Sequence, residues 1–184
     1  MSYFTTAVQR LADGFDRINE GLGQAVSWLS LVMVVVTVVV VVLRYVFGMG
    51  WIWLQESVTF MHAALFLIGG AYTLKHEGHV RVDIIYRKFS ERGQAWIDLI
   101  GTLTLLLPVC LFIFYISWDY VAQSWSLHEG SREVGGLEGV FLLKTLILVM
   151  AVLLVLQGVS IVIRCLSQLF DWRRAPSAGH EIDG

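Results

Sequence analysis

Four long apolar runs dominate the sequence and decide which kind of fold it can adopt. They cover residues 25–43, 57–74, 99–118 and 145–163, and none of them contains Asp, Glu, Lys or Arg. Each run is long enough to cross a bilayer, which takes about 17–25 mostly apolar residues in a helix. Lipid offers no hydrogen-bond partner to the backbone, so an isolated apolar run within it must be helical. The runs predict an all-α integral membrane protein with four transmembrane helices.

The composition of the 184-residue chain excludes several other classes of protein. Hydrophobic residues make up 57% and charged residues 15%, and a soluble domain of this kind would expose large apolar patches. Two prolines in the whole chain argue against disorder. Cys110 and Cys165 each lie in or beside an apolar run, which favours small core residues over disulfides or metal ligands. The first run leads into Arg44 and Tyr45 instead of a small-residue cleavage site, so it is not expected to be a removed signal peptide.

Basic residues are distributed unevenly around the runs and indicate the orientation of the chain. Short cytoplasmic segments retain Lys and Arg, whereas translocated segments lose them. One side carries Arg10, Arg17, Lys75, Arg81, Arg87, Lys88, Arg92, Arg164, Arg173 and Arg174, and the other carries Arg44, Arg132 and Lys144. We therefore expect both termini and the second connection to be cytoplasmic, with the first and third connections facing outward.

Amphipathic segments flank the runs and divide the chain further. In the N-terminal segment, apolar side chains recur three and four positions apart at Val8, Leu11, Phe15, Ile18 and Leu22. This segment could lie in the membrane plane, and residues 80–96 suit an interfacial helix beside anionic lipid, with a solvated linker as the plainer alternative. The predicted organisation is a cytoplasmic amphipathic segment at 1–24, a four-span domain at 25–164 and a cytoplasmic tail at 165–184.

The four runs offer little for catalysis or solute binding. Transporters usually place ionisable side chains near mid-membrane, and here the only one within the runs is His62. All other histidines lie outside the runs, which argues against a haem held between two helices. The sequence has no paired reactive cysteines, phosphate-binding loop, nucleophile elbow or metal-ligand cluster. We expect His62 to be a packing residue and the chain not to be an enzyme.

Candidate functional residues gather at the ends of the first two runs. Arg44 closes the first run, and Trp53 and Glu56 open the second. One possibility is that Arg44 and Glu56 pair at one membrane face and lock the hairpin. The other is that Arg44 reaches lipid phosphate while Glu56 complements the helix dipole.

Two further features lie near the end of the second run. Gly69 and Gly70 would allow a second helix to approach closely. His79 and Asp83 are four positions apart and could share a helix face. A zinc site needs three or four protein ligands, and His79 and Asp83 would supply only two. A metal site is therefore not expected.

The ordered set of these motifs resembles a known family. Arg-Tyr-Val-Phe at 44–47, Trp-x-x-Glu at 53–56, the glycine pair at 69–70 and His-Val-Arg-Val-Asp at 79–83 occur in this order in a four-span chain. This arrangement is similar to the small permease (DctQ-like) subunit of tripartite ATP-independent periplasmic (TRAP) transporters. The resemblance covers roughly residues 25–90.

The resemblance implies a function that the residues alone do not give. In such transporters a periplasmic binding protein captures an organic acid or similar solute, and a large permease moves it with a sodium gradient. The small subunit would be the partner of the large permease in the bacterial inner membrane, with lipids but not nucleic acid as its other contacts. The resemblance implies no cofactor in this subunit. It assigns scaffold roles to Arg44, Trp53 and Glu56 near the periplasmic face, and to His79, Arg81 and Asp83 at the start of the cytoplasmic arm.

Other classes of function remain open at this point. An independent small transporter would be active in liposomes without a partner. A membrane anchor of a redox complex would carry haem or handle quinone. A signalling or assembly factor is a further alternative.

Overall fold

The computed structural model describes residues 2–76, 78, 86 and 88–172, and these residues form an all-helical protein. The helices are α1 (Ser2–Tyr45), α2 (Ile52–Lys75), α4 (Glu91–Gly101), α5 (Leu107–Ser126) and α6 (Val140–Trp172). A π-helical turn, η1 (Thr102–Leu106), joins α4 to α5. Four of the resulting helical stretches are long and apolar enough to cross a membrane, which confirms the prediction of a four-span, all-α membrane protein.

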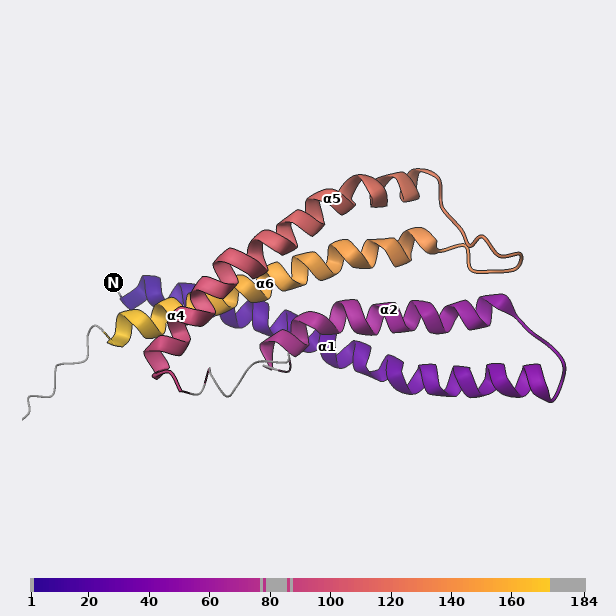
Figure 1. The fold of residues 1–184 in the computed structure, drawn as a ribbon, viewed down its shortest axis with the longest axis horizontal. Helices are drawn as coiled ribbons and strands as arrows, with labels where there is room; N and C mark the ends of the chain where they lie inside the picture. Colours follow the sequence, from indigo (N-terminus) through magenta and orange to yellow (C-terminus); the bar gives the residue numbers. More distant parts are fainter. Residues whose placement is uncertain (1, 77, 79–85, 87, 173–184) are drawn as a thin grey trace, which may run out of the picture.

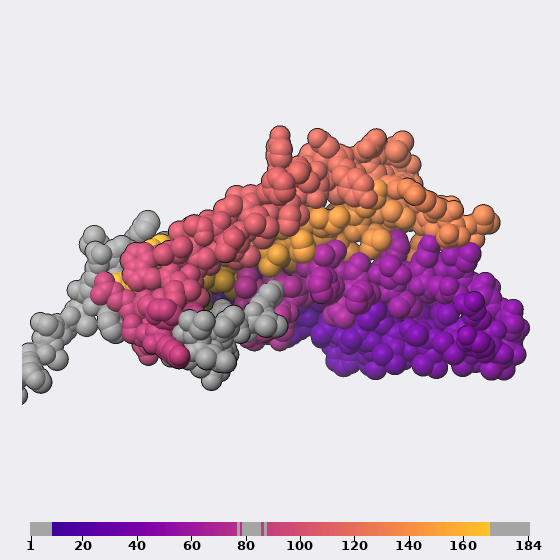
Figure 2. Space-filling view, viewed as in Figure 1, coloured from indigo at the N-terminus to yellow at the C-terminus, as the bar shows by residue number. Residues whose placement is uncertain are grey.

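The four long helices form a layer rather than a closed bundle. In the order α5, α6, α2, α1 they lie side by side, each packed on the next (Figure 1). We call the end where α1 begins and α6 ends the terminal end, and the end with connections 46–51 and 127–139 the loop end. Near the terminal end α1 also packs on α6, whereas toward the loop end α2 and α6 are the neighbouring helices of the α1–α2 and α5–α6 pairs (Figure 2).

The first half of α1 buries a different face from the one that its sequence suggests. Leu11 and Ile18, on the predicted apolar face, are 58% and 47% exposed. The buried stripe is Ala12, Asp16, Asn19, Gly23 and Val26. The α1 helix continues without a break from this segment into the first predicted span, and its small and polar face packs on α6. Burying the polar side chains and exposing the apolar ones suits a helix that enters lipid.

The third span contains a local irregularity with a clear cause in the sequence. Pro108 has no N–H to donate to the carbonyl four residues earlier, and its ring crowds that carbonyl. The chain widens just before it: the Leu107 N–H bonds to the Thr102 carbonyl, five residues back. A wide turn of this type accommodates a proline within a continuing helix. Gly158 of α6 packs here, where an added Cβ would lie 2.9 Å from Leu107.

The predicted arm and tail differ from the observed boundaries. Residues 79–85 and 87 lie outside the described part, and from Glu91 onward the helix continues into the third span without interruption. The Ser90 side chain caps α4 by accepting the Gly93 N–H. Residues 165–172, predicted as the start of a tail, continue α6. Cys165 and Leu169 pack there against Ala95 and Leu99 of α4, so apolar contact extends the helix.

Candidate functional site

A cluster of polar side chains joins α1 to α6 near the terminal end. Asp16 of α1 accepts hydrogen bonds from Ser160 Oγ at 2.7 Å and Gln157 Nε2 at 3.1 Å, and it forms an ion pair with Arg164 at 2.5 Å. Asp16 and Ser160 are 8% and 0% exposed. We call Asp16, Asn19, Gln157, Ser160 and Arg164 the polar cluster. Because a buried carboxylate is costly without partners, its three hydrogen-bond donors fix the position of α1 on α6.

Asn19 extends the polar cluster by one helical turn. Its Nδ2 donates to Gln157 Oε1 at 2.7 Å and to the Leu153 carbonyl at 3.4 Å. Its Oδ1 is buried without a hydrogen-bond partner among the described residues. Gln157 thus donates to Asp16 and accepts from Asn19, which links two successive turns of α1 to one side chain of α6.

Helix α2 joins the same region through its last turn. Lys75 Nζ pairs with Glu20 Oε2 of α1 at 2.6 Å and donates to the Asp16 carbonyl at 3.3 Å. One turn away, Gly23 packs directly beneath the Tyr72 ring, where an added Cβ would lie 2.4 Å from the ring carbons. Only glycine permits this approach, so α1, α2 and α6 are held together within a few turns.

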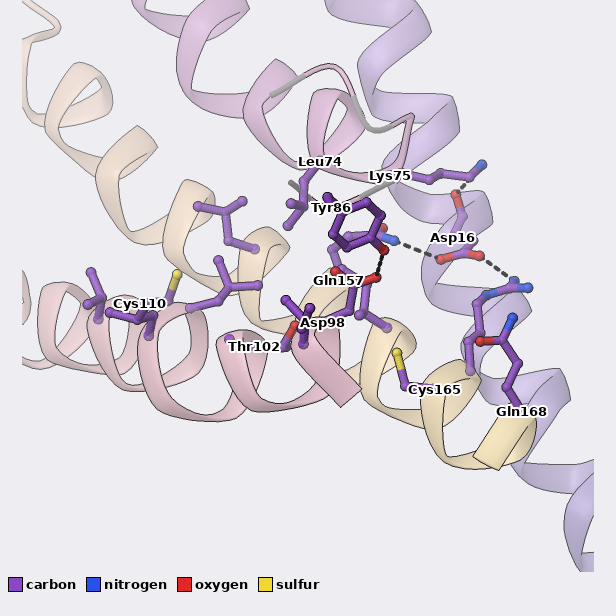
Figure 3. A pocket seen from close by; sticks show the side chains of 18 of the residues that line it. Asp16, Leu74, Lys75, Tyr86, Asp98, Thr102, Cys110, Gln157, Cys165 and Gln168 are labelled. Carbon is purple, nitrogen blue, oxygen red and sulfur yellow. Dashed lines mark hydrogen bonds and ion pairs between the residues drawn. The ribbon is translucent and has the colours of Figure 1, made fainter. Parts of the chain in front are cut away.

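A cleft opens beside the polar cluster, between α4, η1 and α5 on one side and α2 on the other. Its volume is about 1170 Å³, and α6 contributes to its lining. Polar side chains, among them Lys75, Asp98 and Gln168, line one end, and apolar residues of the third span line the remainder. Figure 3 shows Tyr86 reaching across to Asp98, whose Oδ2 accepts the phenol hydrogen at 2.6 Å.

At the loop end, the carboxylate of Glu56 holds the α5–α6 loop (residues 127–139). Ser131 Oγ donates to one carboxylate oxygen, and the Leu137 N–H donates to the other at 2.6 Å. Within the loop the Ser131 N–H bonds to the Leu137 carbonyl at 2.9 Å. A Cβ at Gly136 would lie 2.7 Å from Glu56 Oε2. The loop therefore closes around a side chain of the other helical hairpin.

A second carboxylate fixes the same loop to α5 and α6. Glu129 accepts hydrogen bonds from Lys144 Nζ and, at 2.7 Å, from Ser124 Oγ. Hydrogen bonds from Lys144 and then from Ser124 lower the pKa of the Glu129 carboxyl below its ordinary value. Lys144 Nζ also lies 3.9 Å above the centre of the Tyr120 ring. The α5–α6 loop is thus held from both hairpins, through Glu56 and through Glu129.

Comparison with protein families identifies the chain. The model of the family described as tripartite ATP-independent periplasmic transporters, DctQ component, matches residues 33–169. The match covers most of the chain, from the last third of α1 to the last turn of α6. The chain belongs to the DctQ family. Searches of curated proteins and of solved structures find no match.

The structure separates Arg44 from Glu56 in this DctQ protein. Arg44 is exposed, and no ion pair between the two is present among the described residues. The proposed pairing is therefore wrong: Glu56 lies on the second turn of α2, turned toward the α5–α6 loop, whose N–H and hydroxyl satisfy it. Trp53 is half exposed and stacks on Trp51 with ring centres 6.1 Å apart.

The remaining predicted residues do not form an internal site. Among the described residues, nothing lies within 4 Å of a Cβ added at Gly69 or Gly70, so none of the described helices approaches this pair closely. His79, Arg81 and Asp83 lie outside the described residues. His62 is exposed and stacks on Phe66. Within the described part, no group of three His, Cys, Asp or Glu side chains is placed to hold a metal ion.

Sequence reasoning missed the polar cluster, although a signal for it was present. Gln157 and Ser160 are neutral and lie within the fourth apolar run, so a search for ionisable groups passes over them. Asp16 and Asn19 look like the solvated face of an amphipathic helix. Polar side chains within a span, three and four positions apart, are the pattern that would have indicated a buried hydrogen-bonding seam.

Proposed function

We propose that this DctQ protein is the small membrane subunit of a TRAP-type secondary transporter and braces the large permease subunit. In this role it supports sodium-coupled uptake of an organic acid or similar solute that a periplasmic binding protein delivers. The observation that carries the proposal is the family match over residues 33–169, in a chain with four membrane-spanning helices.

The arrangement of the helices favours a bracing role. The polar cluster fixes α1, α2 and α6 at one end, and Glu56 ties the two hairpins at the other. Between these ends, α1 and α5 expose broad apolar faces, for example at Val38 and Phe112, as expected for helices that contact lipid. A layer whose helices are fixed to one another at both ends is suited to support a neighbour that moves within the membrane. Arg44, Trp53 and Glu56 have structural roles in this proposal.

Chemistry and selectivity are assigned to the other subunits. We propose that this chain is not an enzyme and holds no cofactor, and that sodium coupling resides in the large permease. The distribution of basic residues supports a location in the bacterial inner membrane with both termini cytoplasmic. The terminal end and the polar cluster then face the cytoplasm, and the α5–α6 loop faces the periplasm, where the binding protein docks.

Co-purification and uptake test this function together. The chain, tagged at its C-terminus, is extracted in mild detergent from membranes that also contain the large permease and the binding protein. A stoichiometric complex with the large permease, and solute uptake that requires all three proteins and a sodium gradient, are expected. A coloured, haem-containing chain without a permease, or transport by the chain alone in liposomes, would contradict the proposal and favour a redox anchor or an independent transporter.

A further inference from the structure

One face of α2 exposes a line of mostly polar side chains that reaches the middle of the span. From Gln55 to the end of α2, the exposed side chains are Gln55, Thr59, His62 and Phe66. We call these four residues the outer stripe of α2. Their spacing of four, three and four places them on one line along the helix. His62 lies about 15 Å from the start of a helix about 36 Å long, so the stripe crosses the middle of the span.

The polar members of the outer stripe lack hydrogen-bond partners. Within the described part of the chain, the side chains of Gln55, Thr59 and His62 make no hydrogen bond, and His62 only stacks on Phe66. Exposed hydroxyls of α1 behave differently, since Ser30 and Thr37 each donate to a carbonyl of their own helix at 2.7 Å. An acyl chain offers no hydrogen bond, so lipid leaves the outer stripe unsatisfied.

The glycine pair continues the same line. Gly69 and Gly70 follow Phe66 by three and four positions, and none of the described residues approaches within 4 Å of a Cβ built on either. Gly23 and Gly158, by contrast, lie directly against Tyr72 and Leu107. The missing side chains at 69 and 70 therefore serve no contact within this molecule. They leave space for a helix from another molecule, as small residues do at helix interfaces in membranes.

We infer that the outer stripe of α2, together with Gly69 and Gly70, is the docking face for a transmembrane helix of the large permease subunit. This inference rests on the proposed function. The partner helix presents small residues opposite the glycine pair and at least one polar side chain opposite Thr59 and His62. The layered fold makes this possible, because α2 lies between α1 and α6 and keeps one face free of both.

Photo-crosslinking in the assembled transporter tests the docking face. A benzophenone amino acid is placed at 59, 62 or 66, with positions 38 and 112 on the apolar faces of α1 and α5 as matched controls. Adducts with the large permease are expected at the first three positions and not at the controls. Three results would overturn the inference but leave the subunit assignment standing. They are adducts at 38 or 112 alone, a crosslinked dimer of this chain, and an intact complex without adducts at 59, 62 and 66. Failure of the wild-type chain to co-purify with the permease would remove the proposed function itself.

Substitutions separate docking from folding. G69L points a side chain into open space within this chain, so the thermal midpoint of the isolated protein should not fall. The amount of co-purified permease should drop about fivefold or more, since the close approach is blocked. H62L should reduce it about threefold to eighteenfold, the range for one interhelical hydrogen bond in a membrane. V38L, on the face of α1, should change neither quantity. Unchanged co-purification with both G69L and H62L would overturn the inference.

Discussion

At the terminal end, the Asp16 carboxylate joins two helices from inside their interface, whereas at the loop end the Glu56 carboxylate joins a helix to a loop. Asp16 is almost fully buried and accepts only side-chain donors, all from α6. Glu56 is half-buried and accepts a backbone N–H and a hydroxyl from one short segment. The comparison shows that one type of side chain can fix the packing of helices at one end and the shape of a loop at the other. Loss of the first should affect the whole fold, and loss of the second only its periphery.

The largest effect is expected for D16A. The substitution removes the buried acceptor shared by Ser160 and Gln157 and leaves Arg164 paired with the exposed Asp13 alone, so the free energy of unfolding should fall by about 2–4 kcal/mol. Tryptophan fluorescence during thermal unfolding in detergent measures this loss of stability. D13A is the matched control, because Asp13 also bonds to Arg164, at 2.9 Å, but is exposed. A surface ion pair of this kind contributes about 0–1 kcal/mol. If D16A and D13A lowered the free energy of unfolding equally, the proposed difference between the terminal end and the loop end would be contradicted.

A smaller loss of stability is expected for G23A. The new methyl group would lie 2.4 Å from the Tyr72 ring and force α1 and α2 apart, at a cost of about 1–3 kcal/mol. G21A, two residues earlier, adds the same group where nothing lies within 4 Å. It should be neutral or slightly stabilising because alanine favours the helix. Thermal midpoints of the two variants, compared with the wild type, measure the difference, and a destabilised G21A with an unaffected G23A would contradict the packing.

At the loop end, E56A should act locally. Without the carboxylate, the Leu137 N–H and the Ser131 hydroxyl lose their acceptor, so amide hydrogen exchange within residues 131–139 should accelerate. The thermal midpoint should shift by less than about 3 °C. Exchange in α1 around Asp16 serves as the internal control and should not change. A global loss of protection in E56A would show that the loop end supports the whole layer.

The smallest effect concerns pH at the loop end. The pKa of Glu129 is lowered in the folded protein. Its contribution is therefore complete above the unfolded pKa of about 4.3 and is lost as the pH falls through the lower folded value. The loop should loosen only below about pH 4, as followed by quenching of Trp125, whose indole N–H donates to Thr145. E129Q should remove this acid transition, and loosening between pH 7 and pH 5 would contradict the assignment.

The number and type of the helices could be predicted from the sequence because run length alone decides them. An apolar run of about 20 residues without charge has only one stable structure in lipid. The partners of Glu56 could not be predicted, since Ser131 and Leu137 lie 75 and 81 positions away and no local pattern connects them. Only the folded layer brings the two hairpins together.

The buried face of α1 was misjudged for a different reason. In water, apolar periodicity identifies the core-facing side of a helix, because burial of side chains such as Leu11 and Ile18 is favourable there. Against lipid those side chains are as well placed outside as inside, so hydrogen bonding and close packing decide instead. The correct stripe contains Ala12, Asp16, Asn19 and Gly23, which are small or capable of hydrogen bonding.

The 44 residues of α1 give this helix a length greater than the thickness of a membrane. At 1.5 Å per residue the helix is about 66 Å long, and even at a tilt of about 40° it would extend about 50 Å along the membrane normal. A bilayer with its headgroups is about 40–45 Å thick. A continuous α1 therefore cannot be contained in the membrane, and at least one end projects into water. With the loop end at one membrane surface, the first turns of α1 extend beyond the other surface. Water-soluble reagents should label these first turns, and only lipid-soluble reagents should label the lipid-facing middle of the helix.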